Sequence, residues 1–277
     1  MRFGYGAMIR VFCVTSGTVA ALLCILILAS PGRAADLAER WVEYRNGEVE
    51  VPALLLVPKG KGPHFAVLYI HGRSGLNQRL QGQARRLASR GFAVLAPDYH
   101  TGRFIPENPI EHDPATEKDV EMGLDFLKSL PNLWSQRVCV VGISRGGYHA
   151  ALLAARRSDR VACMVGYYPH LVNPNAPEPV QVYRYMPEIE KLDVPTLLFV
   201  GERDQELRRT LVIRVAERLK ERGRPVELFV YPGAQRAFDF RTVDRTLGDD
   251  LAREDALQRT TVFLRRILQA KGGMKSE

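Results

Sequence analysis

The chain has 277 residues, of which 46% are hydrophobic and 25% charged, with 23 glycines and 17 prolines spread along its length. These are the proportions of a globular protein, and they exclude a disordered, collagen-like or coiled-coil chain. A chain of this length can still form a single α/β domain with a large buried core.

Residues 1–34 have the pattern of a cleaved secretory signal peptide. Two arginines precede an uncharged stretch, residues 11–29, and Gly32 and Ala34 place small residues where cleavage after Ala34 requires them. An uncleaved membrane anchor is the alternative, because the uncharged stretch is close to spanning length. Polar residues in its first half favour cleavage. We therefore expect a periplasmic or secreted protein, in contact with a membrane only if this segment stays attached.

The charge and the cysteines of the remaining chain bear on its partners and redox state. Without residues 1–34 the net charge falls from +8 to +5, because three arginines and no acids lie there. The basic residues form no continuous stripe, so we expect no nucleic-acid partner. Cys139 and Cys163 lie in apolar, strand-like runs. Buried free thiols are expected, although export permits a disulfide if the two strands align the pair.

Strand and helix periodicities alternate from residue 35 onward. Asn46-Gly47 predicts a hairpin turn between the first two strands. The predicted strands are residues 41–44, 49–57, 65–70, 92–96, 138–141, 161–165, 196–200 and 226–231. A hairpin followed by alternating strands and helices requires a mostly parallel sheet covered on both faces. We find no linker or repeat, so residues 35–277 are expected to form a single domain.

Three helices stand out from their patterns. Residues 206–222 carry an apolar residue at every fourth position, and a glycine follows them. A second helix is predicted to start at Asp113-Pro114, in the N-cap and N1 positions, and a third covers residues 252–270. The proline-rich residues 168–194 fit neither period and are expected to form a structured loop or a small lid.

The strand at residues 138–141 runs into a helix through Gly142-Ile143-Ser144-Arg145-Gly146, a G-x-S-x-G sequence. In this context the serine occupies a strained turn that projects its hydroxyl above the sheet, so the residues two positions away must lack side chains. The backbone N–H of Arg145 then faces an oxyanion. Strand, motif and helix together favour Ser144 as a nucleophile over a glycine-rich packing turn.

A second oxyanion donor is expected from the turn that follows residues 65–70. This turn begins His71-Gly72-Arg73, and the backbone N–H of Gly72 or Arg73 is the candidate. Without the serine motif, the same turn could be a plain strand-to-helix connection.

The turn after residues 196–200 carries two acids, Glu202 and Asp204. An acid that follows the nucleophile in the chain can orient a histidine and stabilise its imidazolium. We favour Asp204 for this role. Glu202 could take it instead, or both could be solvated turn residues.

Four segments together resemble the dienelactone hydrolase family of α/β-hydrolases. They are residues 66–77, 86–99, 141–148 and 231–234, and they keep the family's order and spacing from about residue 49 to the C-terminus. The resemblance implies an eight-stranded, mostly parallel sheet flanked by helices. It also implies a nucleophile–His–Asp triad that acts on small esters or lactones without a metal or other cofactor. Ser144 matches the nucleophile, which is cysteine in founding members and serine in many relatives, and Asp204 matches the acid.

The third member of the triad does not match. Where the family has its histidine, this chain has Arg236. A guanidinium stays protonated at any usable pH, so it cannot take a proton from Ser144 and can only pair with Asp204 or hold an anionic group. We expect a hydrolase that forms an acyl-enzyme on Ser144 but is impaired. The alternative is a non-catalytic protein that keeps the fold and binds a ligand or partner.

Other histidines could substitute as the base. His71, His100 and His170 each follow the carboxyl end of a strand, and His112 lies in a loop that could reach over the site. For each of them a structural or solvated imidazole is the competing interpretation. A metal cluster of His100, His112 and Asp113 has no supporting spacing.

Overall fold

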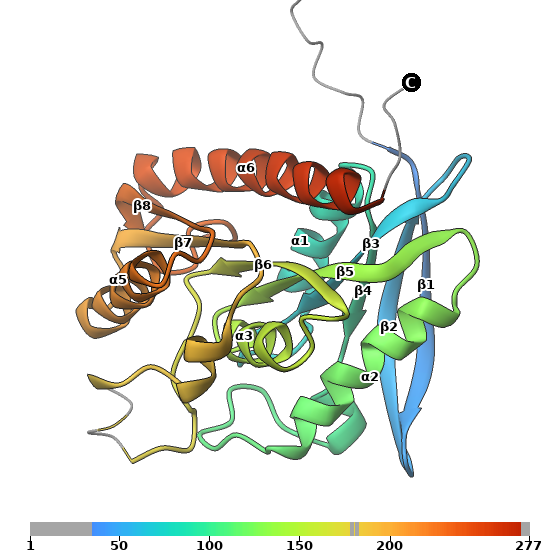
Figure 1. The fold of residues 1–277 in the computed structure, drawn as a ribbon, viewed down its shortest axis with the longest axis horizontal. Coiled ribbons are helices and arrows are strands. Elements are labelled where there is room, and N and C mark those ends of the chain that lie inside the picture. Colours follow the sequence, from blue (N-terminus) through green and yellow to red (C-terminus); the bar gives the residue numbers. More distant parts are fainter. Residues whose placement is uncertain (1–34, 178–179, 181–182, 273–277) are drawn as a thin grey trace, which may run out of the picture. The chain divides into compact units, whose positions relative to one another are not determined.

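The described residues form one eight-stranded sheet with strand order β1-β2-β4-β3-β5-β6-β7-β8 (Figure 1). Its strands are β1 (Leu37–Asn46), β2 (Val49–Pro58), β3 (His64–Ile70), β4 (Ala93–Pro97), β5 (Leu133–Ile143), β6 (Val161–Tyr167), β7 (Thr196–Arg203) and β8 (Val226–Gln235). β2 pairs antiparallel with β1 and with β4, and every other pair is parallel. The carboxyl ends of β3 to β8 therefore lie at one edge of the sheet, where α/β proteins place their ligand sites.

The structure is a computed structural model that describes residues 35–177, 180 and 183–272. The predicted signal peptide lies outside these residues. These described residues cluster as one compact unit. Within the described part, no helix has the length and apolar character needed to cross a membrane.

Helices cover both faces of the sheet (Figure 1). They are α1 (Gln78–Ala88), α2 (Ala115–Ser129), α3 (Gly146–Arg156), α5 (Glu206–Glu221) and α6 (Leu247–Gly272), with 3₁₀ turns η1 (Thr101–Arg103) and η2 (Pro187–Lys191). α1 and α6 pack on one face, and α2, α3 and α5 pack on the other. Successive strand side chains point to opposite faces. Accordingly, Val67 and Tyr69 join the α1–α6 core, whereas Leu68 and Ile70 join the other.

The predicted eight-stranded, mostly parallel sheet is confirmed, and the differences lie at element ends. α2 begins at Ala115, with Pro114 rather than Asp113 as its N-cap residue, although the Asp113 carboxylate still accepts the N–H of Ala115 at 2.9 Å. α6 begins at Leu247, five residues before the predicted start. A turn there is stabilised by Asp249, whose carboxylate accepts the N–H of Thr246 at 2.9 Å. α1 has no counterpart among the helices predicted from periodicity.

The expectation of free thiols is wrong. β5 and β6 pair in a register that sets Cys139 directly opposite Cys163, with 4.6 Å between their Cα atoms, and the two form a disulfide. Both residues are fully buried in the sheet. The strand register decided this pairing, and the local sequence does not encode it.

Candidate active site

Ser144 occupies a strained turn between β5 and α3. Its φ of 53° lies in the left-handed region, which non-glycine residues rarely adopt. A Cβ on Gly142 would lie 2.4 Å from the carbonyl oxygen of Gly146, and a Cβ on Gly146 would lie 2.2 Å from that of Ile70. Both positions therefore require glycine. The turn presents a half-buried serine at the carboxyl edge of the sheet.

The turn after β3 lies directly against this serine. A Cβ on Gly72 would lie 3.2 Å from the Cβ of Ser144. Hydrogen bonds hold this turn in place: the Tyr99 hydroxyl donates to the carbonyl of His71 at 2.8 Å. The N–H of Asn108 also donates to the carbonyl of Arg73 at 3.0 Å. The structure thus brings together the two segments that were predicted to supply oxyanion donors.

Arg236 joins Ser144 to Asp204. Its Nη2 donates to Ser144 Oγ at 2.7 Å, and its Nη1 donates to Asp204 Oδ2 at 3.0 Å. The pairing is possible because β7 and β8 run parallel and end side by side, with Asp204 just past one strand and Arg236 just past the other. The Asp204 side chain is 1% exposed and that of Arg236 22%, so the ion pair is screened from water on the acid's side. Arginine thus occupies the position between nucleophile and acid.

The alternative acid, Glu202, takes a different role. Its Oε2 accepts the backbone N–H of Gly233 at 2.7 Å, and this bond ties the end of β7 to the C-terminal part of β8. The residue is exposed. Of the two acids, Asp204 is therefore the one in contact with Arg236.

Two residues that the sequence did not single out shape this site. The guanidinium of Arg236 lies 5.3 Å from the ring centroid of Tyr168, which is buried. Arg208, in the first turns of α5, is half-buried, and burial followed by the positive charge of Arg236 lowers its pKa to about 10. Arg208 stands four residues after Asp204, which places it near that acid at the start of a helix; this spacing was the available signal.

His170 lies next to Ser144 through the backbone, since its N–H donates to the Ser144 carbonyl at 2.7 Å. Burial, and then the charges of Arg208 and Arg236, lower the pKa of its imidazole to about 3. The ring is therefore neutral near pH 7. Nowhere in residues 35–177, 180 and 183–272 does an imidazole hydrogen-bond to Ser144 Oγ, whose bond is to Arg236.

His71 and His100 belong to a buried aromatic cluster beside the site. The ring of His71 stacks on that of Tyr99 with centroids 3.9 Å apart, and its Nδ1 lies 2.8 Å from the carbonyl oxygen of Gly72. The His100 ring meets the His71 ring edge-on at 4.8 Å. Burial lowers the pKa of His71 well below its usual value and that of His100 to about 4. Both rings are therefore neutral near pH 7, and their role in the structure is to pack against neighbouring rings.

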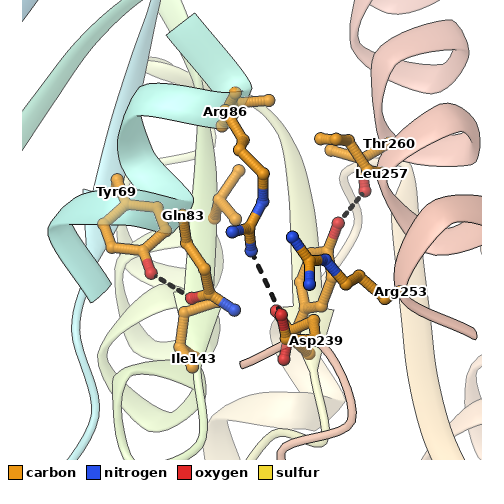
Figure 2. Close-up of a pocket in the computed structure, with 11 residues that line it drawn as sticks. Tyr69, Gln83, Arg86, Ile143, Asp239, Arg253, Leu257 and Thr260 are labelled. Carbon is orange, nitrogen blue, oxygen red and sulfur yellow. Dashed lines mark hydrogen bonds between the residues drawn. The ribbon is translucent and has the colours of Figure 1, made fainter. Parts of the chain in front are cut away.

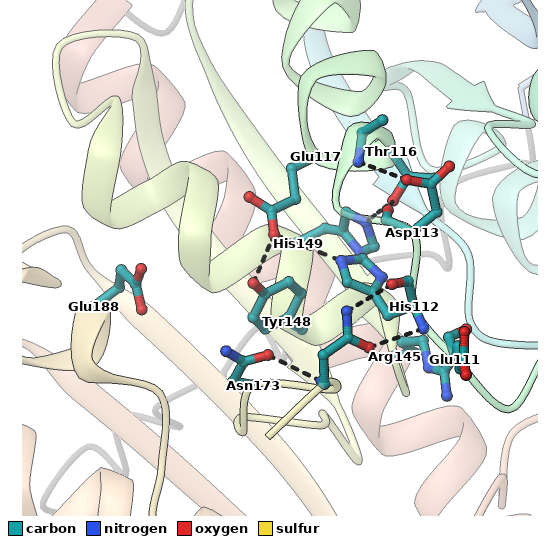
Figure 3. Close-up of polar contacts among 12 residues, drawn as sticks. Glu111, His112, Asp113, Thr116, Glu117, Arg145, Tyr148, His149, Asn173 and Glu188 are labelled. Carbon is teal, nitrogen blue, oxygen red and sulfur yellow. Dashed lines mark hydrogen bonds and ion pairs between the residues drawn. The ribbon is translucent and has the colours of Figure 1, made fainter. Parts of the chain in front are cut away.

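His112 lies in a loop that packs against α3 (Figure 3). The side chain of Asn175 bonds to both the N–H and the carbonyl of His112, at 3.0 and 2.7 Å. Arg145 donates to three successive carbonyls of the same loop, those of Pro109, Ile110 and Glu111. The His112 ring packs against Tyr148 and His149. The side chain of Arg145 therefore anchors this loop, while its backbone N–H belongs to the turn at Ser144.

No group of three or more His, Cys, Asp or Glu side chains within the described ranges is arranged to hold a metal ion. The site is instead rich in arginine. Arg73, Arg145 and Arg236 all lie within electrostatic range of Arg208, and Asp204 is the acid among its electrostatic partners. Positive charge therefore exceeds negative charge around Ser144.

A serine in a strained strand–turn–helix junction, a second loop against it and an acid after a later strand define the α/β-hydrolase class. A family model agrees: residues 51–268 match the dienelactone hydrolase family. The chain belongs to this family. The family resemblance in the sequence is thereby confirmed.

Individual relatives are distant but match along most of the chain. The chain is 26% identical to "Protein usf" of Aquifex pyrophilus, over 82% of this chain and 98% of that one. It is also 26% identical to a protein of Aquifex aeolicus with the provisional name carboxymethylenebutenolidase, over 71% and 85% of the two chains. The dienelactone hydrolase structure from Anabaena variabilis superposes with a TM-score of 0.62 at 20% identity, covering 83% of this chain and 98% of that one.

Proposed function

We propose that this protein is an exported serine hydrolase that acts slowly on small esters or lactones through an acyl-enzyme on Ser144. One observation carries the proposal: Ser144 is held in a strained strand–turn–helix junction, and Arg236 connects its hydroxyl to Asp204. Membership of the dienelactone hydrolase family supports the ester or lactone substrate.

In the proposed reaction Ser144 Oγ attacks the carbonyl carbon, and the N–H groups of Arg145 and of Gly72 or Arg73 hold the oxyanion. The serine proton must leave as this bond forms. Arg236 has no acceptor atom, so water takes the proton in place of a histidine. The ester C–O bond then breaks, the alcohol leaves with a proton from water, and a second water hydrolyses the acyl-serine to release the acid and restore Ser144. Loss of a triad member leaves a residual rate roughly 10³–10⁴-fold over water in well-studied serine proteases, supplied by the oxyanion hole and binding. We expect turnover of that order.

The N-terminal pattern of residues 1–34 supports export. The disulfide between Cys139 and Cys163 is a second support, because disulfides persist in oxidising compartments and are rare in the cytosol.

The test compares wild type with Ser144→Ala on a small chromogenic ester and with an active-site fluorophosphonate probe. Wild type should hydrolyse the ester slowly and become labelled slowly at Ser144, whereas Ser144→Ala should do neither. Labelling of the alanine variant at another residue would overturn the assignment of the nucleophile.

A non-catalytic ligand- or partner-binding protein is the second candidate, favoured by the same Arg236. An arginine that bonds to both the serine and the acid can hold an anionic group beside Ser144, and it offers no route for proton transfer. Equal hydrolysis by wild type and Ser144→Ala, without any labelling, would decide for this candidate.

A further inference from the structure

A pocket lies between α1 and α6, on the face of the sheet that these two helices cover (Figure 2). It has an empty volume of about 360 Å³, open mouth included. Because that figure includes solvent at the mouth, the enclosed space is much smaller and takes only a very small molecule. Apolar side chains line part of it, namely Leu87, Val141, Ile143 and Leu257, together with the rings of Tyr69 and Tyr167.

A buried amide in this pocket has donor groups without an acceptor. Gln83 is 6% exposed, and its Oε1 accepts a hydrogen bond from the Tyr69 hydroxyl. Its Nε2 is buried and has no hydrogen-bond partner among the described residues. Leaving a buried donor unpaired costs about 1–3 kcal/mol, so this group calls for a polar partner, either a water or a ligand.

Two guanidinium groups approach the same space, one from each helix (Figure 2). Arg86 donates to the backbone carbonyl of Asp239 at 3.2 Å. The Nε of Arg253 is buried and makes no hydrogen bond within the described part of the chain; it lies 3.4 Å from the carboxylate of Glu254, which is exposed. With Gln83, these groups provide more donors than the pocket's own acceptors satisfy.

Asp239 is the acid of the pocket, and it is 5% exposed. Its Oδ1 accepts the Tyr168 hydroxyl at 2.8 Å. Burial raises the pKa of Asp239 to about 6, against the opposing effects of Tyr168, Arg86 and Arg253. At mildly acidic pH the pocket therefore holds two cations and a neutral carboxylic acid.

We propose that this pocket is a second binding site, separate from Ser144, for a small monocarboxylate such as propionate. The carboxylate accepts hydrogen bonds from Gln83 Nε2 and from the guanidinium of Arg253, and the short alkyl chain packs against Leu87 and Leu257. A carboxylate has two oxygens with about four acceptor sites, which matches the unused donors, and its charge compensates the excess of arginine. The site does not depend on whether Ser144 is catalytic.

Binding should depend on the protonation of Asp239. The groups facing this acid are Arg86 from α1, Arg253 from α6, Tyr69 from β3, and Tyr167 and Tyr168 at the end of β6. A bound carboxylate adds a negative charge beside it and therefore favours its neutral form. Affinity for propionate should fall by about tenfold or more between pH 6 and pH 8, as Asp239 loses its proton. Asp239→Asn keeps an acceptor for Tyr168 and should remove this pH dependence.

The experiment is calorimetric titration of the folded protein with sodium propionate, followed by a crystal structure with propionate. Arg253→Gln should weaken binding at least about tenfold. The matched control, Arg266→Gln, removes one arginine from the exposed surface of the same helix and should bind as wild type does. Arg208→Gln should also bind as wild type does, which separates this pocket from the arginines around Ser144.

Gln83→Glu is the second variant, because it preserves size and the acceptor for Tyr69 while placing a negative charge in the pocket. It should lose propionate binding even though its circular dichroism and melting temperature stay near those of wild type. The proposal is overturned if wild type binds no propionate at millimolar concentration. It is equally overturned if Arg253→Gln binds as tightly as Arg266→Gln, or if the crystal shows only ordered water between Gln83 and Arg253.

Discussion

Arg236 donates a hydrogen bond to Ser144 Oγ across 2.7 Å, from the position where a serine hydrolase places its general base. The direction of this bond reverses the usual chemistry, because the serine oxygen accepts and its proton has no acceptor in the triad. The other guanidinium nitrogen pairs with Asp204, so the acid neutralises a permanent cation instead of a transient imidazolium. Arg236 thus connects the serine to the acid through two hydrogen bonds, and it has no atom that can accept a proton.

Arg236→His should raise ester hydrolysis by at least about a hundredfold, the low end of what a positioned base contributes. The measurement is kcat/KM on a small chromogenic ester at neutral pH. Arg236→Gln is the control, since it removes the cation without supplying a base and should stay near the wild-type rate.

A high activity of the wild-type protein would contradict an impaired triad. If wild type already turns over small esters at ordinary enzyme rates, another group must accept the proton. Alanine replacement of His71, His100, His112 and His170 in turn would then show which imidazole serves Ser144.

The buried histidines should make the fold sensitive to acid. Burial, followed by the charge of His112, lowers the pKa of His149 to about 3, and burial lowers that of His100 to about 4. In the unfolded chain both groups bind protons near pH 6.5. The stability that depends on their neutral forms is therefore present above pH 6.5 and is lost as the pH falls toward 4.

His149→Gln should make this loss shallower by up to one proton, or about 1.4 kcal/mol per pH unit. Urea unfolding at a series of pH values measures it, with His64→Gln at the half-exposed start of β3 as the control. Parallel pH profiles for wild type and His149→Gln would contradict the prediction.

Gly146→Ala should destabilise the protein by at least about 2 kcal/mol in urea unfolding, because the new Cβ would overlap backbone oxygens and force the turn to shift. That Cβ would lie 2.2 Å from the carbonyl oxygen of Ile70 and 2.4 Å from that of His71. Gly82→Ala is the matched control: it lies inside α1, its Cβ would meet nothing within 4 Å, and it should stabilise the protein by about 0.5–1 kcal/mol. Equal effects of the two substitutions would show that packing at Gly146 is not tight.

Export should remove residues 1–34. Intact-mass measurement on protein expressed with its full N-terminus should give a chain that begins at Ala35, since Gly32 and Ala34 supply the small residues before the cut. Replacing Ala34 with a bulky residue should slow the cleavage. A full-length mass recovered from membranes would favour the anchor.

Local sequence was sufficient to predict most of the fold, because hydrophobic periodicity reports burial directly. It predicted the hairpin, the eight strands along the chain and the strained serine with its flanking glycines. It also placed Ser144, Asp204 and Arg236 at the same edge of the sheet, since these residues follow strands whose carboxyl ends must meet there. The sequence did not predict α1. The helix predicted at residues 252–270 is shorter than α6, which covers Leu247–Gly272.

The sequence by itself therefore determined the α/β sheet, the strained turn at Ser144 and the presence of Asp204 and Arg236 at the same edge. The tertiary structure alone decided which groups come into contact. Cys139 and Cys163 form a disulfide only because β5 and β6 pair in a register that sets them opposite one another. Arg208 is near Arg236, and Asp239 lies between Arg86 and Arg253, because segments distant in the chain pack there. Such contacts depend on register and helix placement, which no local pattern of residues specifies.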